Sequence, residues 1–146
     1  MPGSRTGGAS FIDGDPDGQR IRLRMFVRDD DRRLFGRVWF GPHAEGPPHH
    51  AHGGSVAAVL DHCMGISCWV AGNRVVAASI TINFHHSVPL RLVTLVEAWV
   101  ENVDGRKVTC GGKIHHPGED HAFSTSSGLF IAQPMDRFKG LLDAGS

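Results

Sequence analysis

The sequence has no excess of charge of either sign, few cysteines and no long apolar run, and each absence excludes a class of protein. Fifteen Lys and Arg residues balance fifteen Asp and Glu residues, so the overall charge gives no sign of binding to nucleic acid or to an anionic membrane. No apolar stretch approaches the ~20 residues that a helix needs to cross a bilayer. The N-terminal residues also lack the apolar core of a signal peptide.

The three cysteines, Cys63, Cys68 and Cys110, lack the spacing of a paired motif. An odd number of cysteines without such a motif favours buried free thiols in a reducing compartment. We therefore expect an intracellular, cytoplasmic protein.

The length of 146 residues predicts a single domain with one hydrophobic core. Residues 1–19 are rich in Gly, Asp, Ser and Pro, which favours a flexible N-terminal tail. Residues 20–133 hold every strong periodic pattern and form the expected domain. Residues 134–146 form a short C-terminal tail.

Most segments of the domain alternate between apolar and polar residues, which predicts strands, and one segment is helical. The helix is expected over about residues 53–70, with a stop signal at Gly72. The pair Asp104-Gly105 predicts a tight hairpin. Strands are expected at about residues 21–28, 34–40, 75–86, 92–103, 106–114 and 121–133. Two strands, one long helix and four hairpin-connected strands predict an α+β domain whose antiparallel sheet wraps around a central helix.

The start of the predicted helix is the most informative stretch of the chain. Gly53 and Gly54 allow another molecule to approach closely, and the first-turn N–H groups of a helix have no intrahelical partners. The positive end of the helix dipole favours an oxygen that gains negative charge. Asp61, two turns further on, has the chemistry of a general base or nucleophile. This combination indicates an acyl-transfer site, although a solvated Asp61, or one paired with a neighbouring Arg or His, fits the spacing equally well.

The predicted helix has two different faces. Its bulky apolar face suits packing against a sheet and comprises Val56, Val59, Leu60, Cys63, Met64, Ile66 and Val70. A narrow stripe of small residues surrounds the acid and comprises Gly54, Ala57, Ala58, Asp61, Gly65 and Cys68. Such a stripe permits close approach of a second subunit or of a ligand.

The strand that follows the helix also has two predicted faces. The row expected in the core comprises Val76, Ala78, Ile80, Ile82 and Phe84. The opposite, polar row comprises Ala77, Ser79, Thr81, Asn83 and His85. Hydroxyl groups in the polar row are suited to orienting a water or a carboxylate, while the plain alternative is a solvated sheet face.

Two other kinds of site compete less well. The neighbouring residues His49, His50 and His52 suggest a metal, but no cysteine or carboxylate lies at metal-ligand spacing, and we predict no metal site. Ser55 follows the glycines, yet the Gly-x-Ser-x-Gly signature is absent, which disfavours a serine hydrolase.

Several motifs together resemble a known family, the hotdog-fold acyl-CoA thioesterases. The resemblance covers about residues 34–133. Within this family, the chain is similar in particular to the branch of thioesterase superfamily members that includes the carboxy-terminal modulator protein. The motifs occur in order at the family's spacing: Glu45-Gly46-Pro47-Pro48, His52-Gly53-Gly54 followed by Asp61, Ile80-Thr81-Ile82-Asn83-Phe84 leading to Pro89-Leu90, and Val103-Asp104-Gly105-Arg106-Lys107.

The resemblance implies roles for the residues at the helix start. Asp61 matches the catalytic acid, either as general base for water or as nucleophile on the thioester carbonyl. Gly53 matches the backbone donor of the oxyanion hole, with Gly54 beside it. His52 matches the histidine that positions the loop or the substrate.

The resemblance also implies a hydroxyl group that orients the attacking water, often across a subunit interface. Relatives carry this hydroxyl at the position of Ser79 or of Ala77. Since this chain has Ala77, Ser79 is the candidate and Thr81 the reserve.

The remaining implied roles concern coenzyme A. Asn83 and His85 match positions that contact the CoA part of the substrate, and Arg106 and Lys107 match a basic pair near its phosphates. A solvated hairpin tip is the alternative for this pair. The implied function is hydrolysis of an acyl-CoA thioester by a homodimer or homotetramer, with no metal or organic cofactor. A non-catalytic hotdog module that binds acyl-CoA or an acyl carrier is the alternative.

Overall fold

The computed structural model describes residues 10–12, 14–15, 17–119 and 121–134. In chain order, its elements are β1 (Ile21–Val27), β2 (Leu34–Phe40), the short 3-10 helix η2 (Pro42–Ala44), α1 (Gly53–Val70), β3 (Val75–Phe84), β4 (Val93–Asp104), β5 (Lys107–His115) and β6 (Ala122–Ala132). The predicted order of strands and helix is confirmed.

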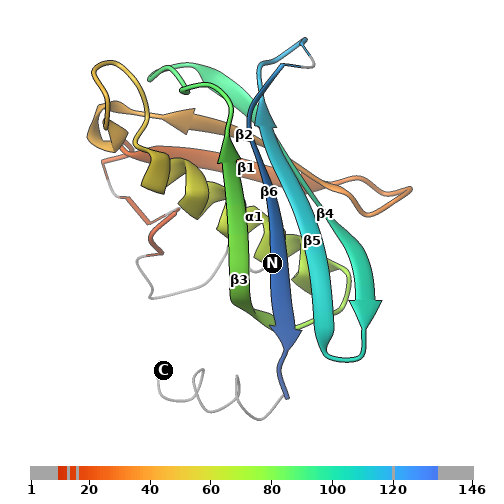
Figure 1. Ribbon diagram of the computed structural model, residues 1–146. Helices are drawn as coiled ribbons and strands as arrows, with labels where there is room; N and C mark the ends of the chain where they lie inside the picture. The colour runs from red at the N-terminus through yellow and green to blue at the C-terminus, as the bar shows by residue number, and fades with distance from the viewer. Residues whose placement is uncertain (1–9, 13, 16, 120, 135–146) are drawn as a thin grey trace.

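All six strands form one antiparallel sheet in the order β1-β2-β4-β5-β6-β3. The sheet curves around α1, which lies along its inner face (Figure 1). Strands β1 and β3 form the two edges. The structure therefore has the expected hotdog fold, an α+β domain with one central helix.

The ends of α1 follow from local sequence signals. The helix begins after His52, whose side chain caps it, and ends at Val70. Beyond it, Gly72 adopts a positive φ of 95°, and the N–H of Asn73 donates to the carbonyl of Cys68 at 2.8 Å. Glycine tolerates this backbone conformation at a helix end better than other residues. The predicted bounds of the helix are confirmed.

The core lies between the inner face of the sheet and the bulky face of α1. Val59, Leu60, Cys63 and Met64 from this face are completely buried. The predicted apolar face of the helix is thus the face that packs on the sheet.

The predicted small-residue stripe is wrong at Cys68. This residue is completely buried, and its Sγ atom lies 2.9 Å from Sγ of Cys110 on β5. Cys68 therefore faces β5, and the stripe ends at Gly65, which remains partly exposed. All three cysteines are free and buried, as expected.

A β-bulge interrupts the alternation that was predicted along β3. Ala77 pairs with Phe130 and Ser79 pairs with Leu129, so the register shifts between them. Directly paired residues of an antiparallel sheet share a face, and Phe130 is buried in the core. Ala77 therefore lies on the inner face, and its predicted place in one row with Ser79 is wrong. The cause is the extra residue of the bulge, which reverses the alternation.

The predicted inner row of β3 is wrong at Val76, which pairs with Ile131 on the outer face, and the rest of the row is less buried than expected. Ile80 and Phe84 lie on the inner face, opposite Gly128 and Ser124 of β6, but they remain 37% and 57% exposed. Because β3 is an edge strand, the single chain covers only part of this face.

Part of the expected N-terminal tail packs against the domain. Ile12 is buried in the core, and the carboxylate of Asp15 accepts the backbone N–H groups of Gln19 and Arg20 at 2.8 Å each. Of the two expected tails, residues 1–9, 13, 16 and 135–146 lie outside the described residues.

No helix in the described ranges is long and apolar enough to cross a membrane. Within the same ranges, the structure holds no group of three or more His, Cys, Asp or Glu residues placed to bind a metal ion.

Candidate active site at the start of the helix

The side chain of His52 leaves one backbone donor free at the start of α1. Nδ1 of His52 accepts the N–H of Gly54 at 2.8 Å, and its carbonyl accepts the N–H groups of Ser55 and Val56 at 2.9 and 3.2 Å. The N–H of Gly53 has no hydrogen-bond partner among the described residues. Of the two glycines predicted to bind substrate, only Gly53 therefore offers an unpaired amide at the positive end of the helix dipole.

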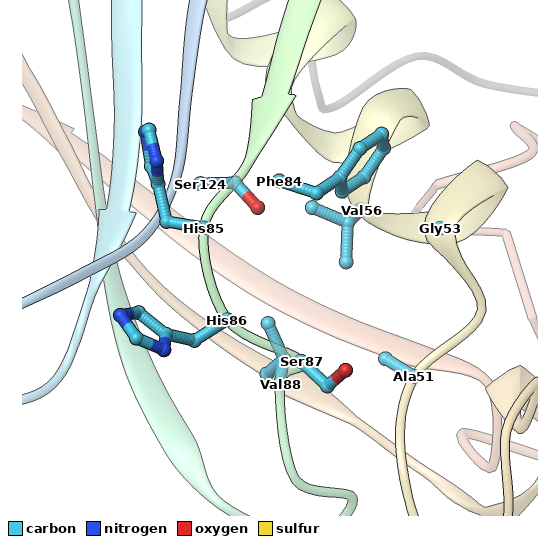
Figure 2. A pocket seen from close by; sticks show the side chains of 9 residues that line it. All are labelled: Ala51, Gly53, Val56, Phe84, His85, His86, Ser87, Val88 and Ser124. Atoms are coloured by element: carbon cyan, nitrogen blue, oxygen red, sulfur yellow. The ribbon is translucent and has the colours of Figure 1, made fainter.

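This amide borders a pocket of about 270 Å³. The walls come from the loop before α1, the first turn of α1, the end of β3 with the loop after it, and the start of β6 (Figure 2). They comprise Ala51, Gly53, Val56, Phe84, His85, His86, Ser87, Val88 and Ser124. A helix N-terminus at the wall of a pocket is suited to holding an oxygen atom that gains negative charge.

Position 53 has room for a small side chain, whereas position 54 does not. A Cβ atom at position 53 would lie 3.5 Å from the ring of Phe84, which is ordinary contact. At Gly54, a Cβ atom would lie only 2.9 Å from Nδ1 of His52. Gly54 therefore makes room for the imidazole that caps the helix.

Asp61 is half-buried on α1. Burial raises the pKa of its carboxyl group above the ordinary value, and the charge of His62 opposes this rise. A raised pKa makes a carboxylate a better proton acceptor. Asp61 is thus suited to the predicted role of general base.

A single chain does not bring Asp61 to the free amide of Gly53. The two residues are eight positions apart on one helix, which is roughly 12 Å along the axis at 1.5 Å per residue. A thioester carbonyl held at Gly53 is therefore out of reach of the same chain's carboxylate, even through one water.

The predicted polar residues of β3 lie on the outer face of the sheet. Ser79 and Thr81 line a groove of about 330 Å³ there, together with Thr109 and Ser127. Since α1 covers the inner face, the sheet separates Ser79 from Asp61 of the same chain.

Asn83 and His85 lie near the end of β3. Asn83 pairs with Thr125 in the ladder and is exposed. Nε2 of His85 lies 2.9 Å from Oγ1 of Thr125, and His85 lines the pocket beside Gly53. Of these two residues, His85 is the one that the structure brings to the candidate site.

The predicted basic pair lies at the other end of the sheet. Arg106 and Lys107 are exposed at the β4–β5 hairpin, and Nε of Arg106 donates to the carbonyl of Ala132 at 3.2 Å. Ala132 pairs with Val75, at the opposite end of β3 from Phe84. Nine residues of strand span roughly 30 Å, so the basic pair is remote from the pocket of its own chain.

Sequence reasoning missed several pocket residues. Ser124 was assigned only to a strand, without a face, and Phe84 was assigned to the core. Alternation along one strand does not identify the strand that pairs with it. The pairing of Ser124 with Phe84 could therefore not be predicted from the local sequence pattern.

These features define a hotdog domain: a curved antiparallel sheet with a single helix on its inner face. At the start of that helix, a free backbone amide is available to donate a hydrogen bond to an oxygen atom of a ligand. Residues 49–122, half of the chain, match the family model described as the thioesterase superfamily. The chain belongs to the thioesterase superfamily.

Individual relatives agree with this assignment. The chain is 30% identical over 117 residues to the acyl-coenzyme A thioesterase THEM4 of Xenopus laevis, an alignment that covers 80% of this chain and 53% of the relative. It is 24% identical over 120 residues to the acyl-coenzyme A thioesterase THEM5 of Homo sapiens, covering 82% of this chain and 49% of the relative. The chain thus spans about half the length of the curated relatives it matches.

Solved structures share the fold. The thioesterase superfamily protein RHA08564 superposes with a TM-score of 0.65 and 30% identity over 68% of this chain and 48% of the other. A hypothetical thioesterase of Streptococcus pneumoniae TIGR4, crystallised with coenzyme A, gives a TM-score of 0.70 at 13% identity over 77% of this chain and 89% of the other. The second likeness concerns the fold alone.

Proposed function

We propose that this domain hydrolyses acyl-CoA thioesters to the free carboxylic acid and CoA. The observation that carries the proposal is the unpaired N–H of Gly53 at the wall of a pocket. Such a donor is suited to the carbonyl oxygen of a thioester, which gains negative charge as the carbonyl carbon is attacked. The relatives named acyl-coenzyme A thioesterases support the choice of substrate.

In the proposed reaction, the thioester carbonyl oxygen accepts a hydrogen bond from Gly53. Asp61 takes a proton from a water whose oxygen attacks the carbonyl carbon, or its carboxylate attacks that carbon and water then hydrolyses the anhydride. The carbon–sulfur bond breaks in either route, and the CoA thiolate leaves and takes up a proton. No metal or organic cofactor takes part, since CoA belongs to the substrate.

We propose further that the site forms between two copies of the chain, as a homodimer or a dimer within a homotetramer. The separation of Gly53 and Asp61 along one helix supports this, because the carboxylate must then come from another helix. Most of β3 is exposed, and its outer edge has no neighbouring strand in the described part of the chain. Pairing of β3 with its two-fold copy sets the two α1 helices antiparallel, so Asp61 of one chain approaches Gly53 of the other.

The same two-fold arrangement suits CoA. It moves the partner's β4–β5 hairpin toward the pocket end of the first chain, where Arg106 and Lys107 of that hairpin are placed to meet phosphates. Asn83 and His85 near the pocket are placed to contact the rest of the CoA. The resemblance offers Ser79, with Thr81 in reserve, as the water-orienting hydroxyl, but both lie on the outer face of the sheet, away from the face that α1 covers, so this geometry does not support that role. Three buried free thiols support a reducing, cytoplasmic location.

Hydrolysis is tested with CoA thioesters of several acyl lengths and a thiol reagent that detects released CoA. Wild type should turn over at least one of them, and Asp61→Asn should lower kcat by orders of magnitude while substrate binding is largely kept. The matched control is Asp104→Asn, which removes an exposed carboxylate at a hairpin tip and should leave kcat unchanged. Tight binding of acyl-CoA without any turnover would show a binding module instead.

The shared site is tested by mixing two inactive variants. Asp61→Asn lacks the base, and Gly53→Pro lacks the amide hydrogen. Unfolded and refolded together, they should regain activity, because a mixed dimer holds one site with both groups intact. If both groups act within one chain, the mixture should stay inactive. Replacing Gly53→Pro by Ser79→Ala in this mixture tests whether Ser79 also acts across the interface.

A further inference from the structure

Ser124 on β6 is a buried hydroxyl group without a partner. The residue is completely buried, and its Oγ atom has no hydrogen-bond partner among the described residues. It pairs with Phe84 on the inner face of the sheet and lines the pocket beside Gly53. In Figure 2 its hydroxyl points toward the space that the labelled side chains surround, on the side of Val56.

The buried and part-buried hydroxyl groups of Ser126, Ser67 and Ser55, near the same face, bond to the protein. Oγ of Ser126, two residues along the same strand, donates to Sδ of Met64 at 3.4 Å. Oγ of Ser67 donates to the carbonyl of Met64 at 2.6 Å, and Oγ of Ser55 donates to the carbonyl of His52 at 2.7 Å. Buried polar groups without partners are rare because they forfeit their hydration. Ser124 therefore differs from its neighbours in offering a hydrogen bond to whatever fills the pocket.

We propose that Ser124 binds an oxygen substituent on the acyl group, so that the domain prefers hydroxy- or oxo-acyl thioesters over unsubstituted ones of equal length. This inference rests on the proposed function. With the thioester carbonyl at Gly53, the acyl group extends into the pocket that Ser124 borders. A hydroxyl or keto oxygen there accepts the Oγ–H hydrogen bond, whereas an unsubstituted chain leaves Ser124 unpaired.

Beside this buried hydroxyl group, the pocket offers apolar walls to a short carbon chain, while the polar side chains of His85, His86 and Ser87 are exposed. Ala51, Val56, Val88 and the ring of Phe84 supply apolar walls. The volume of about 270 Å³ leaves room for a short acyl group. A site built around one buried hydroxyl group discriminates against analogues that lack its partner.

The test compares kcat/KM for butanoyl-CoA with that for 2-hydroxybutanoyl-, 3-hydroxybutanoyl- and 3-oxobutanoyl-CoA. Wild type should favour at least one oxygenated substrate by roughly tenfold, the effect of one well-placed hydrogen bond. Ser124→Ala should remove this preference while butanoyl-CoA is turned over within a few-fold of wild type. Ser126→Ala is the control: it removes a hydroxyl group that in wild type bonds to Met64 and not to substrate, and it should keep the preference.

Two results overturn the inference: equal kcat/KM for all four substrates in wild type, or a preference that survives in Ser124→Ala. If Ser124→Ala does not fold, Ser124→Cys, which keeps a side chain of similar shape with a weaker donor, should reduce the preference.

Absence of turnover with every thioester would refute the proposed function rather than this inference. In that case, calorimetry measures the binding of four unreactive thioether analogues of the same substrates, and their affinities decide whether Ser124 recognises the oxygen substituent. An oxygenated analogue must bind roughly tenfold more tightly than the unsubstituted one in wild type and not in Ser124→Ala, and equal affinities reject the role of Ser124.

Discussion

Gly53→Pro replaces the one backbone hydrogen that the proposed chemistry needs with a ring carbon, at a position where the backbone accepts proline. Position 53 is the first residue of α1, where proline is favoured because its N–H would have no helical partner. The residue before it, His52, has φ −62° and ψ 136°, which is the extended conformation that precedes proline readily. A Cβ atom at position 53 makes only ordinary contact with Phe84.

Stability and activity should therefore change in opposite directions. No hydrogen bond among the described residues is lost, and proline at a compatible site restricts the unfolded chain, which stabilises the fold by about 0.4–1 kcal/mol. Loss of an oxyanion donor should lower kcat about 10²- to 10³-fold, equivalent to roughly 2.7–4 kcal/mol of transition-state stabilisation.

The assay pairs calorimetric unfolding with acyl-CoA turnover, and Gly53→Ala serves as the control because it keeps the amide hydrogen. Gly53→Ala should retain much more activity than Gly53→Pro. Turnover by Gly53→Pro within a few-fold of Gly53→Ala would refute the assignment of the oxyanion donor. A large loss of stability would refute the description of this residue as the helix start.

Three further changes test the neighbouring assignments. His52→Ala should lose the cap on Gly54 and destabilise the domain by about 1 kcal/mol, roughly 2–4 °C in Tm, whereas His52→Asn should restore both stability and turnover; restored stability without turnover would give the imidazole a direct role. Because burial raises the pKa of Asp61, a pH–rate profile should show kcat/KM falling as the pH drops through that raised pKa. Because the pKa of Asp61 is higher in the folded state than in the unfolded state, protonated Asp61 favours folding, and this stabilisation is lost as the pH rises through the raised pKa. At neutral pH Asp61 therefore adds no stability, and Asp61→Asn should not lower Tm. Replacing Arg106 and Lys107 together by alanine should raise KM for acyl-CoA several-fold at low salt with kcat little changed, and an equal effect on thioesters without the nucleotide would argue against phosphate binding.

The order of elements was predictable because its signals are local. The stop at Gly72 and the tight turn at Asp104-Gly105 each depend on a few adjacent residues, and both occur where predicted. The apolar face of α1 follows from the helical period, so Val59 and Leu60 were correctly placed in the core. The glycine pair and Asp61 identified the helix start as the place to look for chemistry, and the family resemblance then assigned roles to its residues.

What was missed depends on which strands become neighbours. The bulge between Ala77 and Ser79 arises in the pairing of β3 with β6, and alternation along β3 alone gives no sign of it. The contact between Cys68 and Cys110 and the unpaired hydroxyl of Ser124 likewise form only when distant segments pack together. The free amide of Gly53 depends on the direction of one imidazole ring, which the motif His-Gly-Gly does not specify.

The exposed edge of β3 also has a consequence for how the protein behaves in solution. An unpaired strand edge is a template for any other extended chain, and here it carries the partly exposed apolar side chains of Ile80 and Phe84. The bulge gives this edge a fixed irregularity, so a partner strand that does not match it pairs poorly. Substitutions that keep the chain monomeric should therefore increase aggregation, and those that fill or remove the bulge should increase it further.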